Sequence, residues 1–268
     1  MYPKIITLYG PFELNSYNTA IMIGIGLFLY LANKNPIRAQ LMSRSDFFNL
    51  CAESAVAAIV GGRLLHVISS SSQYPDLYSV LSIWDGGLSI LGALIAVVAY
   101  STWATYKKGI SFFAVGDLVA LYLPLVHAAG RLGCFLVGCC YGAPTDLMWA
   151  VTYTDPRVMA PLKCALHPSQ LYSSALYLLL FLGLWIYSKS SSAKSSHSSV
   201  RTAGTLTCLY IMGMSFERFI IDFFRGDRVI ISTSPLSLYQ WVAIALFVGA
   251  SAVLIRIRHR SVGAHESF

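Results

Sequence analysis

Charged side chains are scarce in this chain, and their scarcity excludes an ordinary soluble protein. Only 12% of the 268 residues are Asp, Glu, Lys or Arg, about half of the roughly 25% that a soluble domain carries. Hydrophobic residues make up 56%, and the long apolar runs each approach the ~20 residues that cross a bilayer. The composition therefore indicates a polytopic membrane protein.

Three further signals are lacking. The first thirty residues hold no compact basic segment and no clear cleavage site, so we expect them to stay in the mature protein. No basic run is interleaved with aromatic residues, so the net charge of +7 indicates membrane topology and no nucleic-acid partner. No internal repeat is found, which disfavours an inverted-repeat transporter.

The apolar runs predict an all-α protein, a single transmembrane domain over residues 1–268 with seven helices. We expect the spans near residues 17–33, 48–70, 87–106, 112–129, 169–188, 203–224 and 237–256. Lys and Arg are more frequent in the connections on the side of the C-terminus, so the positive-inside rule places the N-terminus outside and the C-terminus in the cytoplasm. A Ser-rich stretch at about 188–202 is predicted to be a flexible cytoplasmic linker. An external loop or head region is expected at about 130–167, and its length is uncommon without a function.

Three arginines lie within or beside these apolar runs. A charge inside a span costs at least ~2.5–3.5 kcal/mol on insertion scales, so each one needs a reason. Arg63, Arg131 and Arg218 fall toward the outer halves of their predicted helices. Because a guanidinium keeps its charge and matches phosphate with two donors, we expect them to bind an anionic headgroup. The alternative is packing by ion pairs, and Arg218 shares a helix face with Asp222 four residues later.

His167 opens the segment HPSQLY, in which Pro168 and Ser169 predict the start of the fifth helix. That position puts His167 at the outer surface beside the long loop. The residue is a candidate for acid–base chemistry, and a role in starting the helix explains it equally well.

The segment GRLGCFLVGCCYG places Cys134, Cys139 and Cys140 within seven positions. We rank three explanations. Small packing residues come first, and a disulfide between one of the adjacent pair and Cys164 comes second. A metal site, with His167 as a further ligand, comes third because the usual CxxC spacing is lacking.

Three segments, GRLGCFLVGCCYG, LHPSQLYSS and FERFIIDFFRGD, resemble in order and spacing the signature segments of the prolipoprotein diacylglyceryl transferases. The segment IWDGGLSILGAL at residues 83–94 resembles a fourth. The resemblance implies transfer of diacylglyceryl from phosphatidylglycerol to the lipobox cysteine of exported prolipoproteins, with release of glycerol phosphate. It also implies a multi-pass enzyme of the bacterial cytoplasmic (inner) membrane. Its partners are phosphatidylglycerol, the prolipoprotein signal peptide and membrane lipids, and it needs no metal or organic cofactor.

The same resemblance implies the site residues. Arg131 and Arg218 would hold the phosphate and stabilise charge on the departing glycerol phosphate, Asp222 would orient Arg218, and His167 is the candidate for proton transfer. Arg63 is expected at the substrate because of its charge. The motifs place further positions there, namely Tyr17, Gly86, Gly87, Gly130, Gly133, Gly138, Gly142 and Gln170.

Four positions depart from the family pattern. Leu91 stands where a histidine proposed as general base is typical, Cys134 replaces an asparagine, Cys139 a glutamate and Met214 a tyrosine. Either a substitute such as His127, His167 or an acidic group supplies the base, or deprotonation is left to water. A thiol with a pKa of about 8.5 is partly ionised without a base, so a cationic site can suffice. Two alternatives stay open: a paralogue with another acceptor, and a carrier or binding protein for anionic lipid. A purely structural subunit explains neither Arg131 nor Arg218 and ranks last.

Overall fold

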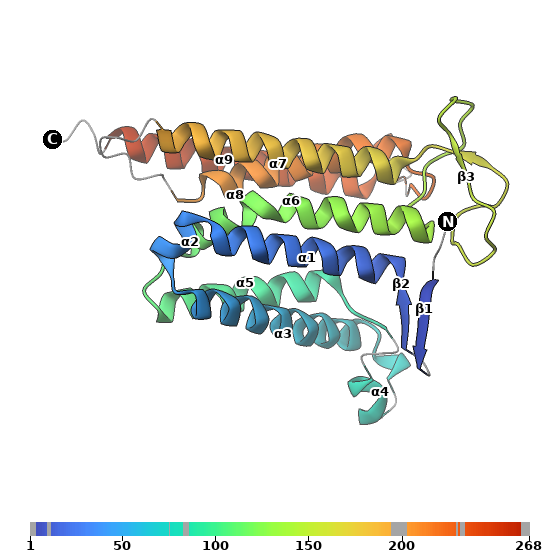
Figure 1. The fold of residues 1–268 in the computed structure, drawn as a ribbon, viewed down its shortest axis with the longest axis horizontal. Coiled ribbons are helices and arrows are strands. Elements are labelled where there is room, and N and C mark those ends of the chain that lie inside the picture. The colour runs from blue at the N-terminus through green and yellow to red at the C-terminus, as the bar shows by residue number, and fades with distance from the viewer. Residues whose placement is uncertain are drawn as a thin grey trace. The chain divides into compact units, whose positions relative to one another are not determined.

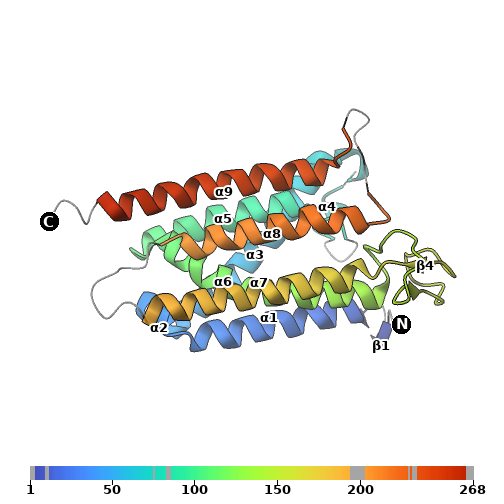
Figure 2. The same ribbon diagram turned by 90° about the horizontal axis from the view of Figure 1, so that it is seen from above.

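The computed structural model describes residues 4–9, 12–74, 76–82, 86–193, 203–228, 230 and 234–263. The helices are α1 Ser16–Lys34, α2 Pro36–Leu41, α3 Arg44–Ser69, α4 Leu77–Leu81, α5 Ile90–Lys107, α6 Phe112–Val137, α7 Ser169–Ala193, α8 Thr205–Ile221 and α9 Leu238–Gly263. The short 3₁₀ turns are η1 Ser71–Gln73 and η3 Asp222–Phe224, and the strands are β1 Lys4–Tyr9, β2 Phe12–Asn15, β3 Val151–Thr152 and β4 Ala165–Leu166. Within the described ranges, the strands form only the antiparallel pairs β1–β2 and β3–β4 (Figure 1 and Figure 2). The predicted all-α class is confirmed.

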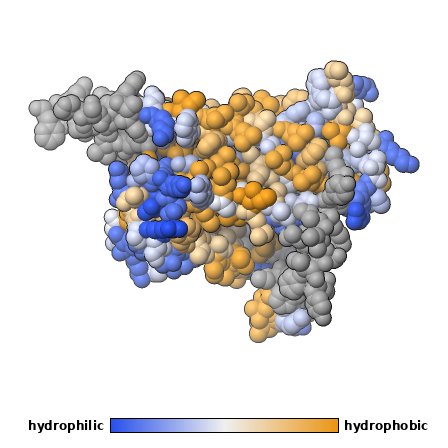
Figure 3. All heavy atoms as spheres, viewed as in Figure 1, coloured by the Kyte–Doolittle hydropathy of each residue, from blue (hydrophilic) through white to orange (hydrophobic). Residues whose placement is uncertain are grey.

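Five helices are long and apolar enough to cross a membrane by length and composition: α3, α5, α6, α7 and α9. The other two predicted spans are helical as α1 and α8 but do not belong to these five. Bulky apolar side chains on the helix surfaces are exposed, among them Ile23, Leu64, Leu179 and Val248. On the face drawn in Figure 3, hydrophobic side chains gather over the middle of the helices and hydrophilic ones toward their ends. Exposed apolar surface of this extent fits a multi-pass membrane protein.

Two predicted boundaries differ from the structure. The fourth span is predicted at 112–129, but α6 continues to Val137, so Arg131 lies on the helix and the segment that connects α6 to α7 begins at Gly138. The glycines at 130 and 133 lie within this helix and do not end it. The predicted linker at about 188–202 is also too long at its start, because α7 extends to Ala193. Residues 194–202 lie outside the described residues.

The chain divides into two compact units, and the first holds Met1–Ala32 and Gly116–Phe268. In this unit α8 packs against α7 and α9, and the three helices run alongside one another in Figure 2. The contacts of Asp117 explain why a charged residue lies in an apolar run. Its carboxylate oxygens accept the backbone N–H groups of Gly204 at 2.9 Å and Thr207 at 2.8 Å. Asp117 on α6 thus satisfies donors at the start of α8 that have no partner inside that helix.

The second unit holds Asn33–Val115, and its main contact is the pair α3 and α5. The two helices approach at glycines: a Cβ on Gly61 would lie 2.7 Å from the carbonyl oxygen of Gly92, and a Cβ on Gly92 would lie 2.6 Å from Leu65 Cβ. Small residues at a crossing let helix backbones come close. This contact fixes the end of α3 that carries Arg63.

Candidate active site

The carboxyl end of α6 is shaped by one glycine. Gly138 has a φ of +74°, and its backbone N–H donates to the Cys134 carbonyl at 2.9 Å, as that of Cys139 does at 3.1 Å. A left-handed glycine of this kind caps a helix and turns the chain back along it. A Cβ at this position would lie 2.7 Å from Val158 Cβ. Gly138 therefore folds Cys139 and Cys140 back beside Cys134.

The HPSQ segment at the start of α7 holds this turn. Ser169 Oγ donates to the Cys140 carbonyl at 3.1 Å, and Gln170 Nε2 donates to the Cys139 carbonyl at 2.9 Å and to the Tyr153 hydroxyl at 3.2 Å. Gln170 is 1% exposed, so its side-chain amide makes its hydrogen bonds inside the protein. A contact between Gln170 and substrate stays a prediction.

Backbone hydrogen bonds join the third signature segment to the other two. Ala143 N donates to Phe224 O at 2.8 Å, and His167 N donates to the Ala143 carbonyl oxygen at 3.0 Å. Gly142 pairs with Arg225 in an isolated antiparallel bridge. A Cβ on Gly142 would lie 2.6 Å from His167 Cβ and closer still to the His167 carbonyl, so this close approach requires glycine. The first unit thus brings all three segments to one place, which we call the segment junction (residues 139–143, 166–170 and 222–227).

Three arginines lie in or near the segment junction: Arg225 within it, Arg131 on α6 and Arg218 on α8. Arg131 and Arg225 both lie close enough to Arg218 and to Cys140 to interact with them electrostatically. Arg131 makes no hydrogen bond or ion pair with another residue in the described ranges. Arg225 is held by Asp227, whose two carboxylate oxygens accept from Nε at 2.8 Å and from Nη2 at 2.6 Å. Like charges in a partly buried place repel, so the cluster favours an anionic ligand.

Asp222 links Arg218 to a second arginine. It is 1% exposed, with its carboxylate 3.7 Å from Arg218 Nη2 and 3.4 Å from Arg228 Nε. Its Oδ2 also accepts a hydrogen bond from Ser237 Oγ at 2.6 Å. The predicted pair between Arg218 and Asp222 is confirmed as an ion pair, and the orientation of Arg218 by Asp222 stays a prediction.

Arg218 lines a cavity of about 230 Å³. Its guanidinium carbon stands 4.4 Å from the centre of the Tyr239 ring, and its side chain is 23% exposed. The other lining residues are Tyr177, Met214, Ser215, Tyr239, Val242, Ala243 and Leu246. One fixed cation in a mostly apolar wall suits an amphiphile with an anionic headgroup.

Tyr17 and His167 lie in the same unit as this cluster. Tyr17, in the first turn of α1, packs on Gly133 and lies within electrostatic reach of Arg131 and of the three clustered cysteines. His167 stacks edge-on against Phe224 at 5.4 Å between ring centres. Its Nδ1 is buried and has no hydrogen-bond partner among the described residues, which leaves one ring nitrogen for a proton or a ligand.

The motif glycines contact other parts of the protein. Gly133 meets α1, Gly138 ends α6 and Gly142 meets the His167 backbone, while Gly130 has only ordinary contact with Ile21. That they let a lipid approach the backbone stays a prediction. Packing within the protein explains the glycines at 133, 138 and 142.

Arg63, Gly86 and Gly87 belong to the second unit. The guanidinium of Arg63 is buried at 7% exposure and donates to the carbonyls of Ser79, Val80, Ser82, Gly86 and Gly87 and to the Tyr74 hydroxyl. Both glycines have a positive φ, +85° and +77°. These bonds hold the segment between α4 and α5, and a phosphate contact by Arg63 stays a prediction.

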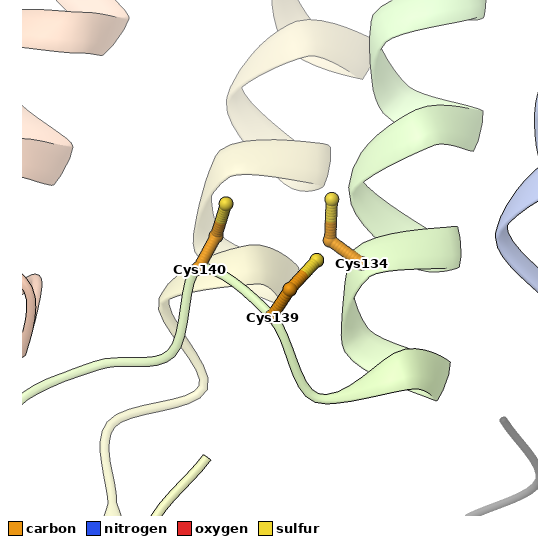
Figure 4. Close-up of side chains that lie close together, drawn as sticks. All are labelled: Cys134, Cys139 and Cys140. Atoms are coloured by element: carbon orange, nitrogen blue, oxygen red, sulfur yellow. The ribbon is translucent and has the colours of Figure 1, made fainter. Parts of the chain in front are cut away.

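The side chains of Cys134, Cys139 and Cys140 lie close together, and the Cys139 thiol points toward that of Cys134 (Figure 4). Their Sγ atoms all lie within 4.8 Å of one another. Hydrogen bonds with Cys134 and Cys139, helped by the nearby guanidinium groups, hold the pKa of Cys140 below its ordinary value, although burial raises it. All six cysteines are free, so the alternative disulfide to Cys164 is not present in this structure.

Sequence reasoning missed two features of the site. It gave Arg225 no role in the site, although its place at the end of FERFIIDFFR puts it close to Arg218. It also ranked a metal site at Cys134, Cys139 and Cys140 last because the CxxC spacing is lacking. The signal was Gly138, since a glycine directly before CC at a helix end predicts the turn that brings these thiols back to Cys134.

Known proteins match this chain along nearly its whole length. The family model described as prolipoprotein diacylglyceryl transferase matches residues 3–256. Similar curated proteins are named phosphatidylglycerol–prolipoprotein diacylglyceryl transferase. The protein of Bordetella avium is 30% identical over 260 residues, covering 94% of this chain and 93% of its own length. That of Polynucleobacter asymbioticus is 32% identical over 251 residues, covering 90% of each chain. That of Thermotoga maritima is 33% identical over 226 residues, covering 83% of this chain and 74% of its own length. This chain therefore belongs to the prolipoprotein diacylglyceryl transferase family.

Proposed function

We propose that this chain transfers the diacylglyceryl group of phosphatidylglycerol to the thiol of the lipobox cysteine in an exported prolipoprotein and releases glycerol phosphate. The observation that carries the proposal is the segment junction, which groups Arg131, Arg218 and Arg225 in the unit whose apolar cavity Arg218 lines. The names of the relatives support the same reaction and the same two substrates.

Arg131 and Arg218 bind the phosphate of phosphatidylglycerol. Arg131 has no protein partner among the described residues, so its donors are free for a ligand. Arg218 extends from the cavity wall, and Asp222 keeps it oriented. Each guanidinium presents a planar pair of donors that matches two phosphate oxygens. The acyl chains then lie against apolar walls and the lipid around the protein.

The reaction forms one carbon–sulfur bond and breaks one carbon–oxygen bond. The acceptor thiolate attacks the glyceryl carbon that carries the phosphate, and the electron pair of the broken bond stays on the phosphate oxygen. Fixed cations that face this oxygen stabilise the charge as it develops. His167, with an unpaired Nδ1 in the segment junction, carries the proton lost by the thiol toward the solvent or the leaving group.

The proposal includes seven spans in the bacterial cytoplasmic membrane, with the N-terminus outside and the C-terminus in the cytoplasm. α1 and α8 supply the two spans beyond the five that length and composition identify. The distribution of Lys and Arg among the connections supports this orientation. It puts the carboxyl end of α6 and the start of α7 on the outer side, where exported prolipoproteins arrive.

A transfer assay tests the function directly. Purified protein in vesicles receives phosphatidylglycerol labelled both in an acyl chain and in the phosphate, with a lipobox peptide that has either cysteine or serine at the acceptor position. We expect acyl label on the cysteine peptide alone and an equal amount of labelled glycerol phosphate in the water phase. Lipid that binds and never reacts would contradict the proposal and indicate an anionic-lipid carrier.

A further inference from the structure

The three clustered thiols have the spacing of a metal site. Thiolates that bind Zn²⁺ at about 2.3 Å in a tetrahedral arrangement lie about 3.8 Å apart. The Sγ atoms of Cys134, Cys139 and Cys140 all lie within 4.8 Å of one another. A small contraction therefore suffices to place one ion among them.

Hydrogen bonds to the backbone carbonyls of these cysteines fix their main chain, and their sulfur atoms lie close together. Cys134 is on α6, and its carbonyl accepts from Gly138 and Cys139. The carbonyls of Cys139 and Cys140 accept from Gln170 and Ser169. Because the backbone of these ligands is already fixed, they lose little conformational entropy when they bind an ion.

The charges at the segment junction favour thiolates around a dication. Three thiolates and one Zn²⁺ have a net charge of −1. Arg131 and Arg225 lie close enough to Cys140 to interact electrostatically with its sulfur. Positive groups placed behind the ligands in this way stabilise an anionic metal–thiolate unit.

No fourth His, Cys, Asp or Glu joins this cluster among the described residues. Structural zinc sites are closed by four protein ligands, whereas catalytic sites have three and keep one position open. A disulfide fits the cluster less well, because Cys139 and Cys140 are adjacent in sequence and a bond from either to Cys134 leaves the third thiol unpaired.

We propose that Cys134, Cys139 and Cys140 bind a zinc ion whose open fourth position accepts the thiol of the prolipoprotein cysteine. This inference rests on the proposed function for the identity of that thiol. A free thiol is only a few per cent ionised at pH 7, and a thiol bound to zinc is deprotonated outright. Zinc binding releases the thiol proton to solvent. The bound sulfur then attacks the glyceryl carbon, the carbon–oxygen bond breaks, and glycerol phosphate leaves with the electron pair.

Metal content is the first test. The full-length protein is purified in detergent with a phosphine reductant and no chelator, and its metals are measured by plasma mass spectrometry. We expect about one zinc ion per chain. Cys134→Ser and Cys140→Ser should each lose most of it, and Cys164→Ser, which changes a thiol outside the cluster, should keep it. A wild-type protein without zinc, with copper in its place, or with a disulfide within the cluster would overturn the proposal.

The open position is tested with cobalt in place of zinc. We expect thiolate-to-cobalt charge-transfer absorption that rises when the cysteine lipobox peptide is added and stays constant with the serine peptide. No rise with the cysteine peptide would overturn the binding of the acceptor thiol.

Activity after zinc removal separates the two proposals. Full transfer by chelator-treated, zinc-free protein would overturn the zinc site and leave the transferase function standing. Zinc and peptide-thiol binding without any transfer would support the site and refute the function.

Discussion

Replacing Gly142 with alanine tests whether the segment junction positions the arginines that we propose to bind the phosphate. The added Cβ would lie 2.6 Å from His167 Cβ and 2.9 Å from the His167 carbonyl carbon. Ordinary contact begins at 3.4 Å, so the two backbones must separate by about 1 Å, and both belong to signature segments. Overpacking of this kind costs about 1–3 kcal/mol of stability.

The effect on activity should exceed the effect on stability. A displacement of about 1 Å in a group that positions a substrate can lower the rate about 100-fold. We therefore expect Gly142→Ala to reduce kcat/KM for diacylglyceryl transfer about 100-fold, while the purified protein still unfolds in a single thermal transition at a slightly lower temperature.

Gly183→Ala is the matched control. The same methyl group is added on α7, where nothing lies within 4 Å of the new atom, and the change should leave transfer unaltered. If Gly142→Ala kept full activity in vesicles, the close packing of the three segments would be irrelevant to catalysis and our account of the junction would be wrong.

Three further substitutions separate structural from catalytic roles. Arg63→Ala leaves buried carbonyls without their donor, so we expect about 3 kcal/mol or more of lost stability, visible as a lower melting temperature in detergent; an unchanged melting temperature would contradict this role. Asp117→Ala removes acceptors at the start of α8 and should cost about 0.5–2 kcal/mol, with kcat per folded molecule unchanged; a selective loss of kcat would refute a purely structural Asp117. Arg157→Ala breaks a surface pair whose hydrogen bonds hold the pKa of Asp155 at about 2, so the pair is ionised throughout the assay range. Loss of the Arg157–Asp155 pair should change neither stability nor transfer measurably. A clear decrease in transfer would show that the loop with Arg157 has a role that our account lacks.

The helices could be predicted because their signal is local. Apolar runs of membrane length and the start signal at Pro168 and Ser169 identified the elements. The i, i+4 spacing identified the pair between Arg218 and Asp222, which the structure confirms. The end of α6 was predicted too early because glycines at 130 and 133 resemble stops, whereas the actual stop is the left-handed Gly138.

The features that could not be predicted depend on contacts distant in sequence. Arg63 was expected at a phosphate because its charge needs a partner, and only the fold shows that carbonyls at positions 79–87 surround it. Gln170 was expected at the substrate, and only the fold shows its bond to the Cys139 carbonyl. Residue type predicted that these side chains matter, and tertiary structure decided which partner each one has.

The measurement that tests the central claim most directly is transfer by Arg131 variants. Arg131 has no hydrogen bond or ion pair within the part of the chain that the structure describes, so Arg131→Ala should leave the melting temperature unchanged. Loss of a donor to the developing charge should lower kcat about 10²–10³-fold, equivalent to about 2.7–4 kcal/mol, and Arg131→Lys should restore only part of it because lysine lacks the planar fork. Full activity of Arg131→Ala in phosphatidylglycerol vesicles would contradict the claim that this arginine holds the phosphate.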